Sequence, residues 1–218
     1  PFAARVLEPG VVGIRGIKRW VLCAAVRRGQ TEGFVSELRE YLPMLAPAQD
    51  VLEVGLSNVN PVVHVPGTLL NLGLVDAGVF RELDFYQVLV GRVSRVIAQL
   101  DAERVRLGSA LGYSLLPLEE FDRRSYEGVQ RAYAVGQAGQ RWSEAANVPP
   151  RYIEEDVPMG LVPLASLARA SGLRLPVAEL MIDLACLVQG TDYRAQGRTL
   201  EKLGVREVGE LRGEVEDE

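Results

Sequence analysis

Apolar and polar residues alternate near the start of the chain in the manner of β-strands. Three β-rich runs follow one another there: ARVLE (4–8), VVGIRGI (11–17) and RWVLCAAV (19–26). Pro9-Gly10 separates the first two runs and is a turn signal. A lone antiparallel ribbon is marginally stable in water, and the chain that follows is helical. We therefore interpret these strands as the end of a domain that precedes them.

From Thr31 the spacing of apolar residues becomes helical. A helix that opens at Thr31 and stops at Pro43 would align its apolar positions Phe34, Val35, Leu38 and Leu42. Residues 49–54 are predicted to form a short strand, and Ser57 and Asn58 to begin a long helical region.

The stretch 91–112 has the clearest helical pattern in the chain. Its apolar face comprises Val93, Val96, Ile97 and Leu100. Its polar positions are Arg92, Arg95, Asp101 and Glu103. This division predicts an amphipathic helix with one face against the core.

Prolines divide the rest of the chain. Residues 117–138 are predicted to hold one or two helices, whereas Pro149, Pro150 and Pro158 predict loop or extended chain over 139–160. Residues 163–170 and 176–188 are predicted helices that each begin at a proline. The apolar stripe of the second is Val177, Leu180, Met181, Leu184 and Val188. The expected fold class is mostly α (α+β), a small β ribbon followed by a bundle of roughly seven or eight helices.

Charge and composition narrow the classes of partner. The 24 basic and 29 acidic residues give a net charge of −5, which disfavours a broad nucleic-acid footprint. No apolar run approaches the ~20 residues of a membrane span, and residues 1–10 do not resemble a signal peptide. Cys23 and Cys186 lie in apolar runs, which predicts buried free thiols in a reducing compartment. We expect a cytoplasmic protein without nucleic-acid or membrane partners.

His64 is the only histidine and the first candidate for chemistry. It falls in the first turns of a predicted helix that Asn58 or Asn60 would cap, with Pro61 at a permitted early position. Imidazole titrates near neutral pH, so His64 is a natural general acid or base. The alternative is a half-buried histidine with a structural hydrogen bond. A second histidine and closely spaced cysteines are both missing, so no metal site is predicted.

Two polar segments are further candidates. RYIEEDVPMG (151–160) holds a carboxylate that could orient an imidazole and an arginine that could bind a substrate carboxylate. Alternatively, it is a solvent-exposed charge run before a helix. GTDYRAQGRTLEKLG (190–204) mixes glycines with charged residues, but it is equally consistent with a helix C-cap at Gly190, a turn and a short helix.

Taken together, four segments resemble the C-terminal helical domain of opine dehydrogenases of the octopine/nopaline type. They are NPVVHVPGTLLNLG (60–73), LDAER (100–104), RYIEEDVPMGLVPLASLARASG (151–172) and MIDLACLVQGTDYRAQGRTLEKLG (181–204). The first strands are similar to those that close this family's nucleotide domain, so the resemblance covers about residues 1–205. Such enzymes join an amino acid and a 2-oxo acid as an imine and reduce it with NAD(P)H.

The resemblance implies a role for individual residues. His64 takes the position of the family's general acid/base, Asp156 that of the carboxylate paired with it, and Arg151 that of the arginine that binds a substrate carboxylate. It also implies substrate contacts from Asn60, Asn71 and Tyr86, and cofactor contacts from Asp192 and Arg194. No metal is implied. The implied cofactor is NAD or NADP, but the glycines at 10, 13 and 16 do not form the GxGxxG dinucleotide fingerprint, so the main binding loop is expected outside this chain.

The resemblance also divides the chain into parts. Residues 1–55 are expected to be the C-terminal part of a nucleotide-binding, Rossmann-type domain, 56–212 the helical catalytic and substrate domain, and 213–218 an acidic tail. The expected partners are an amino acid, a 2-oxo acid, a nucleotide-binding domain in the same protein or in a second chain, and a second copy in a homodimer.

The sequence departs from the family at two places. Val65 stands between His64 and Pro66, where the family commonly has His-Pro, and residues 87–96 lack its Glu-Gly-Thr/Ser pattern. An alternative function is therefore a non-catalytic helical dimerisation or scaffold module derived from the same fold. A weaker alternative is a nucleic-acid-binding helix pair at 200–211, which the acidic neighbours of that segment disfavour.

Overall fold

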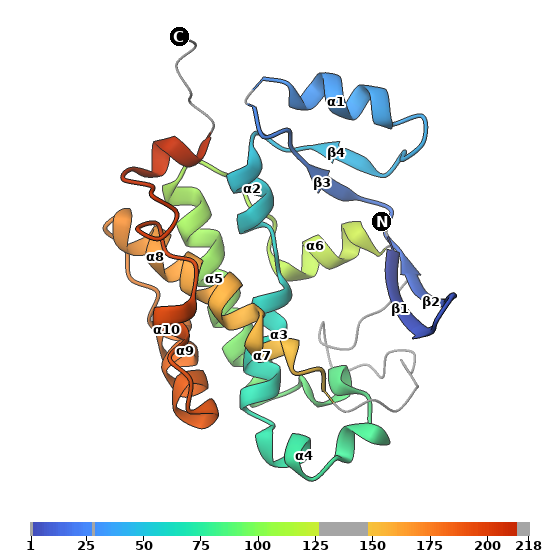
Figure 1. Ribbon diagram of the computed structural model, residues 1–218, viewed down its shortest axis with the longest axis vertical. Helices are drawn as coiled ribbons and strands as arrows, with labels where there is room; N and C mark the ends of the chain where they lie inside the picture. The colour runs from blue at the N-terminus through green and yellow to red at the C-terminus, as the bar shows by residue number, and fades with distance from the viewer. Residues whose placement is uncertain (1, 28, 127–147, 213–218) are drawn as a thin grey trace.

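The computed structural model describes residues 2–27, 29–126 and 148–212, and within them the chain is mostly helical (Figure 1). The predicted mostly-α fold class is thus confirmed. Strands occur near the start of the described chain, and helices make up the body that follows.

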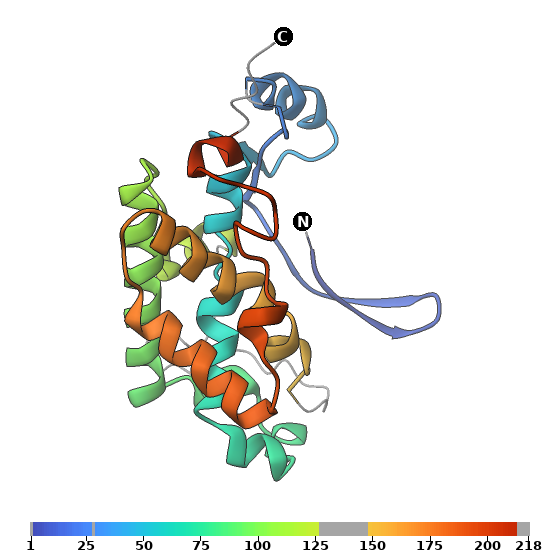
Figure 2. The same cartoon turned by 60° about the vertical axis from the view of Figure 1, so that its left-hand side comes forward.

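The first two strands form the predicted hairpin. β1 (Phe2–Glu8) pairs antiparallel with β2 (Val11–Ile17), and Gly10 supplies the positive φ of 83° that the turn between them requires. Figure 2 shows the hairpin extending away from the helical body. Val6 and Val12 are accordingly 69 % and 56 % exposed.

The next elements form a β–α–β unit. β3 (Val21–Cys23) pairs in parallel with β4 (Leu45–Pro47), and α1 (Thr31–Leu38) lies in the connection between them. The expected helix therefore ends at Leu38, short of Pro43. Such a unit is the building block of parallel sheets with helical crossovers.

The strand prediction for residues 49–54 is wrong, because α2 (Val51–Leu56) occupies most of that segment. Asp50 explains the difference: its Oδ1 accepts hydrogen bonds from the backbone amides of Leu52 and Glu53, both at 3.0 Å. An N-cap of this kind satisfies amides that have no partner in a first helical turn. The cap overrides the β-rich composition of the segment.

The helical body contains the remaining elements (Figure 1). In chain order its helices are α2, α3 (Asn60–Leu69), α4 (Leu72–Asp76), α5 (Arg92–Ala110), α6 (Leu118–Ser125), α7 (Arg151–Glu154), α8 (Val162–Ala170), α9 (Pro176–Gln189) and α10 (Tyr193–Gln196). The described chain also has short 3₁₀ helices, η1 (Val79–Arg81), η2 (Phe85–Val88) and η5 (Val208–Arg212), and a π-helical turn, η4 (Val157–Leu161). α3 is the central helix: it is buried from Pro61 onward and packs against α5, α7, η4 and α9.

The proline-rich segment is more regular than predicted. Residues 139–147 lie outside the described part of the chain, but 151–161 form α7 and η4 rather than loop or extended chain. Pro150 stands at the N-cap of α7 and Pro158 in the first turn of η4, where a missing N–H breaks no helical hydrogen bond. α8 and α9 also have a proline in their first turn, and both of these helix starts were predicted.

α5 confirms the predicted helix but not its division into faces. Asp101, Glu103 and Arg104 are all buried, and Arg104 is only 1 % exposed. The Arg104 guanidinium donates to Asp101 Oδ1 at 2.6 and 2.9 Å and to the carbonyls of Leu56 and Leu116. These charged groups are buried because each has partners, a condition that periodicity does not reveal.

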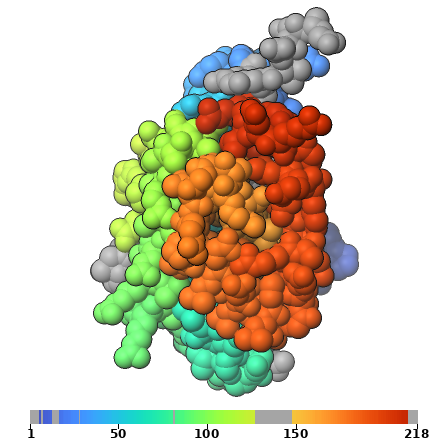
Figure 3. All heavy atoms as spheres, turned by 90° about the vertical axis from the view of Figure 1, so that its left-hand side faces the viewer, coloured from blue at the N-terminus to red at the C-terminus, as the bar shows by residue number. Residues whose placement is uncertain are grey.

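α9 also packs differently from its predicted stripe. The face that it buries consists of Ala178, Met181, Ile182 and Ala185. Leu180 and Val188 are instead 60 % and 42 % exposed. Small alanines on this face allow close approach to α3, α5 and η4. Figure 3 shows α9, in orange, at the surface of the molecule.

The described residues 200–212 do not form the helix pair that the nucleic-acid alternative requires. Gly190 has a φ of 61° and ends α9 as predicted, and α10 follows after a turn. Residues 200–207 form turns and bends before η5. The structural premise of the nucleic-acid alternative is therefore wrong.

Candidate active site

His64 is held inside α3. The capping prediction needs correction: Val59 is the N-cap residue and supplies no side-chain hydrogen bond, while Asn58 Oδ1 accepts from the Asn60 amide at 3.1 Å. Pro61 lies in the first turn as predicted, and His64 is 6 % exposed. The helix therefore carries the imidazole into the interior.

Asp156 is the direct partner of this imidazole. It lies between α7 and η4, and its Oδ2 is 2.7 Å from Nδ1 of His64. The two side chains are 7 % and 17 % exposed. Because an ionised carboxylate can only accept, this contact places a proton on Nδ1 and leaves Nε2 as the nitrogen that can exchange one.

Aromatic side chains fix the plane of the imidazole. The Tyr152 ring stacks on it with a centroid distance of 3.6 Å and an interplanar angle of 7°. The Tyr86 hydroxyl lies 3.3 Å from Nε2, and the ring centroids of Phe85 and the imidazole are 6.4 Å apart at an interplanar angle of 63°. The histidine thus has a fixed orientation, which acid–base chemistry on a bound substrate requires.

Arg151 belongs to the same neighbourhood. Its guanidinium carbon is 5.4 Å from the centroid of the Tyr152 ring on which His64 stacks. The side chain is exposed, and it has no ion-pair partner among the described residues. A guanidinium in this state can bind a carboxylate through two parallel hydrogen bonds.

Asn60 and Asn71 lie on or next to α3. Asn60 is exposed in the first turn of the helix. Asn71 is half-buried just beyond the helix, where its Nδ2 donates to the Gly67 carbonyl at 2.8 Å.

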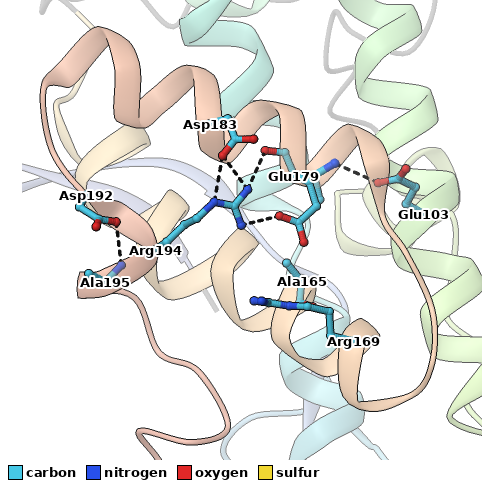
Figure 4. Close-up of polar contacts among 9 residues, drawn as sticks. Glu103, Ala165, Arg169, Glu179, Asp183, Asp192, Arg194 and Ala195 are labelled. Atoms are coloured by element: carbon cyan, nitrogen blue, oxygen red, sulfur yellow. Dashed lines mark hydrogen bonds and ion pairs between the residues drawn. The ribbon is translucent and has the colours of Figure 1, made fainter.

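Asp192 and Arg194 are not brought into contact with the His64 group. Asp192 caps α10 by accepting from the Ala195 amide at 2.9 Å. Arg194 binds Asp183 at 2.7 Å and also pairs with Glu179, both on α9 (Figure 4). Partial burial opposes the charged form, but the hydrogen bonds that the guanidinium donates to these two carboxylates raise the pKa of Arg194. In the described structure Asp192 caps α10, and Arg194 attaches α10 to α9.

Tyr152 is a member of this group that sequence analysis missed. The sequence feature that could have indicated it is its position next to Arg151, in the charged segment 151–160 that was already a candidate. A ring adjacent to an arginine and within reach of the histidine was a candidate for stacking.

Elsewhere in the described part of the chain, the cavity and the cysteines do not form a second candidate active site. A cavity of about 460 Å³ lies between α2, η4, α8 and residues 198–211, but none of the predicted site residues lines it. In the described part of the chain, no three His, Cys, Asp or Glu residues are grouped as metal ligands, and no helix is long and apolar enough to cross a membrane. Cys23 and Cys186 are free thiols, half-buried rather than fully buried.

A helical domain built around a buried His–Asp pair is the class of protein that these observations define. A family model described as "NAD/NADP octopine/nopaline dehydrogenase, alpha-helical domain" matches residues 47–189. The chain belongs to this family.

Individual relatives agree with the family match. The chain is 31 % identical to an opine dehydrogenase from Arthrobacter sp. (strain 1C) over 209 residues, which cover 94 % of this chain and 58 % of the relative. It is 26 % identical to a vitopine synthase from Allorhizobium ampelinum over 161 residues, which cover 72 % of this chain and 45 % of that protein. The chain therefore spans about half the length of these relatives.

Solved structures share the fold. A structure of octopine dehydrogenase with NADH and pyruvate covers the whole chain with a TM-score of 0.64 at 16 % identity, and the match includes 63 % of that chain. A second structure, with NADH and L-arginine, gives a TM-score of 0.63 at 17 % identity and is covered to 64 %.

Proposed function

We propose that this chain is the substrate-binding and catalytic domain of an opine-type dehydrogenase. The reaction condenses an amino acid with a 2-oxo acid and reduces the resulting imine to a secondary amine at the expense of NAD(P)H. The observation that carries the proposal is the 2.7 Å contact between His64 and Asp156, enclosed by aromatic rings and next to an exposed arginine. Relatives studied with pyruvate and L-arginine support these substrate classes.

The described residues do not fit a dinucleotide by themselves. The connection between β3 and α1 contains Gly29 as its single glycine, not the GxGxxG turn that binds a pyrophosphate at a helix N-terminus. We therefore assign nucleotide binding to a further domain, in the same protein or in a second chain. Asp192 and Arg194 remain the proposed contacts of the helical domain with the cofactor. The chemistry assigned to this chain is proton transfer and substrate binding.

His64 would move the protons of imine formation. Nε2 accepts a proton from the attacking amine as the new C–N bond forms, and the imidazolium returns it to the former carbonyl oxygen to give the neutral carbinolamine. A second proton, taken from solvent through Nε2, then allows the hydroxyl to leave as water and gives the protonated imine. Asp156 stabilises the imidazolium, since its carboxylate is the hydrogen-bond acceptor of Nδ1. NAD(P)H bound by the further domain would supply the hydride that reduces this protonated imine to the neutral secondary amine.

Arg151 would hold a substrate carboxylate. The product carries two carboxylates flanking the secondary amine, and an exposed guanidinium beside the Tyr152 ring can bind one of them. Asn60, Asn71 and Tyr86 are proposed to complete the substrate contacts. The Tyr86 hydroxyl is 3.3 Å from the nitrogen that exchanges the proton, so it would lie next to the reacting amine.

The test uses the complete protein that contains this chain and follows NADH or NADPH oxidation with amino acid and 2-oxo acid pairs. His64→Asn should lower kcat by ~10²–10⁴-fold, the usual contribution of a general acid or base. Asp156→Asn should lower it by roughly 10- to 100-fold, the worth of one hydrogen bond to a charged group.

Glu155→Gln is the matched control for Asp156→Asn, because it removes the same charge from the exposed neighbouring residue. It should leave kcat unchanged. Equal turnover of wild type and His64→Asn would refute the catalytic role. A wild-type protein that condenses no such pair would favour the non-catalytic helical module.

A further inference from the structure

A polar stripe runs along α3 and contains one residue without an assigned role. Asn60, His64, Thr68 and Asn71 follow at spacings of four, four and three residues, which places them on one face of the helix and its continuation. Three of the four are already site candidates. Thr68 is the exception.

The Thr68 hydroxyl is buried without a partner. The residue is 5 % exposed, and its Oγ1 makes no hydrogen bond within the described part of the chain. Thr31 is an instructive contrast: it is also 5 % exposed, but its Oγ1 accepts from the Ala25 amide at 3.1 Å. Because burying an unpaired hydroxyl is unfavourable, such a group in a native fold needs an explanation.

Thr68 lies one helical turn after His64 on the same face of α3. Cα–Cβ bonds tilt toward the helix N-terminus, so Thr68 covers the turn that carries the imidazole. Side chains four residues apart on a helix are neighbours, with Cβ atoms about 5–6 Å apart. On the adjoining side of the helix, Gly67 is packed tightly against Phe85 and Leu89, which are apolar and offer the hydroxyl no partner.

We propose that the Thr68 hydroxyl binds a carboxylate oxygen of the condensed substrate. The inference rests on the proposed function and extends it, because the two-carboxylate product needs a second anion contact besides Arg151. A threonine hydroxyl donates one hydrogen bond to such an oxygen without adding charge beside the imidazole. The hydroxyl then acquires in the complex the partner that it lacks in the free protein.

The experiment compares Thr68→Val with Thr68→Ser and with the control Thr31→Val. The first arm measures thermal unfolding of this chain without substrates. Thr68→Val should raise Tm by roughly 2–4 °C because it removes an unpaired buried hydroxyl, whereas Thr31→Val should lower Tm by a similar amount because it removes a paired one. A lower Tm for Thr68→Val would show that the hydroxyl is satisfied inside the protein and would overturn the proposal.

The second arm measures KM for each substrate in the complete protein. Thr68→Val should raise KM by roughly 10- to 100-fold for the substrate whose carboxylate it binds, and Thr68→Ser should restore it. A change confined to the amino acid or to the 2-oxo acid identifies the carboxylate. An active wild type with both KM values unchanged in Thr68→Val refutes the role of Thr68 alone, whereas an inactive wild type refutes the proposed function.

Discussion

One added methyl group tests how the contact between α3 and η4 supports the candidate site. A Cβ at Gly160 would lie 2.2 Å from Cγ and 2.8 Å from Cβ of Pro61. Carbon atoms in favourable contact are about 3.5 Å apart or more, so the two elements would have to separate by roughly 1 Å. His64 follows Pro61 by three residues and Asp156 precedes Gly160 by four, so their 2.7 Å contact would lengthen with this movement.

The cost of Gly160→Ala follows from the stiffness of both partners. The proline ring cannot rotate away, and overpacking of this kind costs about 1–3 kcal/mol. For a chain of this size that lowers Tm by roughly 2–12 °C. Gly55→Ala is the matched control, since Gly55 is an exposed position of α2 and its Cβ would meet nothing within 4 Å. The free energy of unfolding of Gly55→Ala should rise by about 0.5–1 kcal/mol, because alanine favours the helix more than glycine does.

The assay needs only this chain, because it contains a single histidine. Thermal unfolding gives the stability, and NMR of the imidazole gives one set of signals that report on the Nδ1 hydrogen bond to Asp156. In Gly160→Ala the Nδ1 proton signal should move upfield or broaden by exchange, and in Gly55→Ala it should not change. A Gly160→Ala protein as stable as wild type with an unchanged imidazole spectrum would refute the reasoning.

Two further predictions concern stability. Arg104→Met leaves the buried Asp101 carboxylate without its cation, so it should lower the free energy of unfolding in urea by about 3–5 kcal/mol. Arg106→Met, the matched control at an exposed arginine of the same helix, should lower it by less than about 1 kcal/mol. Burial and the hydrogen bond to Asp50 raise the pKa of Tyr113 above its ordinary value of 10. The unfolded tyrosine therefore ionises first, and the free energy of unfolding should fall as pH rises above 10. Unfolding curves of Tyr113→Phe should show a shallower fall, and an equal slope in both proteins would contradict the assignment.

Much of the fold could be predicted because local signals were strong. Pro9-Gly10 marks the hairpin turn, the apolar spacing of 91–112 marks α5, and Gly190 marks the end of α9. Each of these signals depends on backbone conformation or on the spacing of apolar residues. Such signals need no knowledge of which elements meet.

Burial of charge could not be predicted from the same pattern. Asp101 and Glu103 count as polar on any helical wheel, yet Asp101 pairs with Arg104, and Glu103 accepts from the amides of Val177 and Ala178 at the start of α9. Figure 4 shows the Glu103 side chain directed toward α9. A carboxylate at a helix N-terminus satisfies amides that would otherwise be unpaired. Which helix begins beside α5 is a tertiary fact, so the burial of these residues follows from topology rather than from periodicity.

The candidate site combines both kinds of information. Family resemblance selected His64, Asp156 and Arg151, but prolines in 149–158 were interpreted as breaks when they are helix starts. The consequence is chemical, because two short turns that meet at Asp156 direct its carboxylate to Nδ1 while Tyr152, one turn earlier, covers the imidazole face. In an extended chain residues 152 and 156 would point to the same side but lie roughly 13 Å apart, too far to contact the same imidazole. The helical conformation of this segment is therefore what allows one short stretch to supply the stacking ring, the carboxylate and the arginine together.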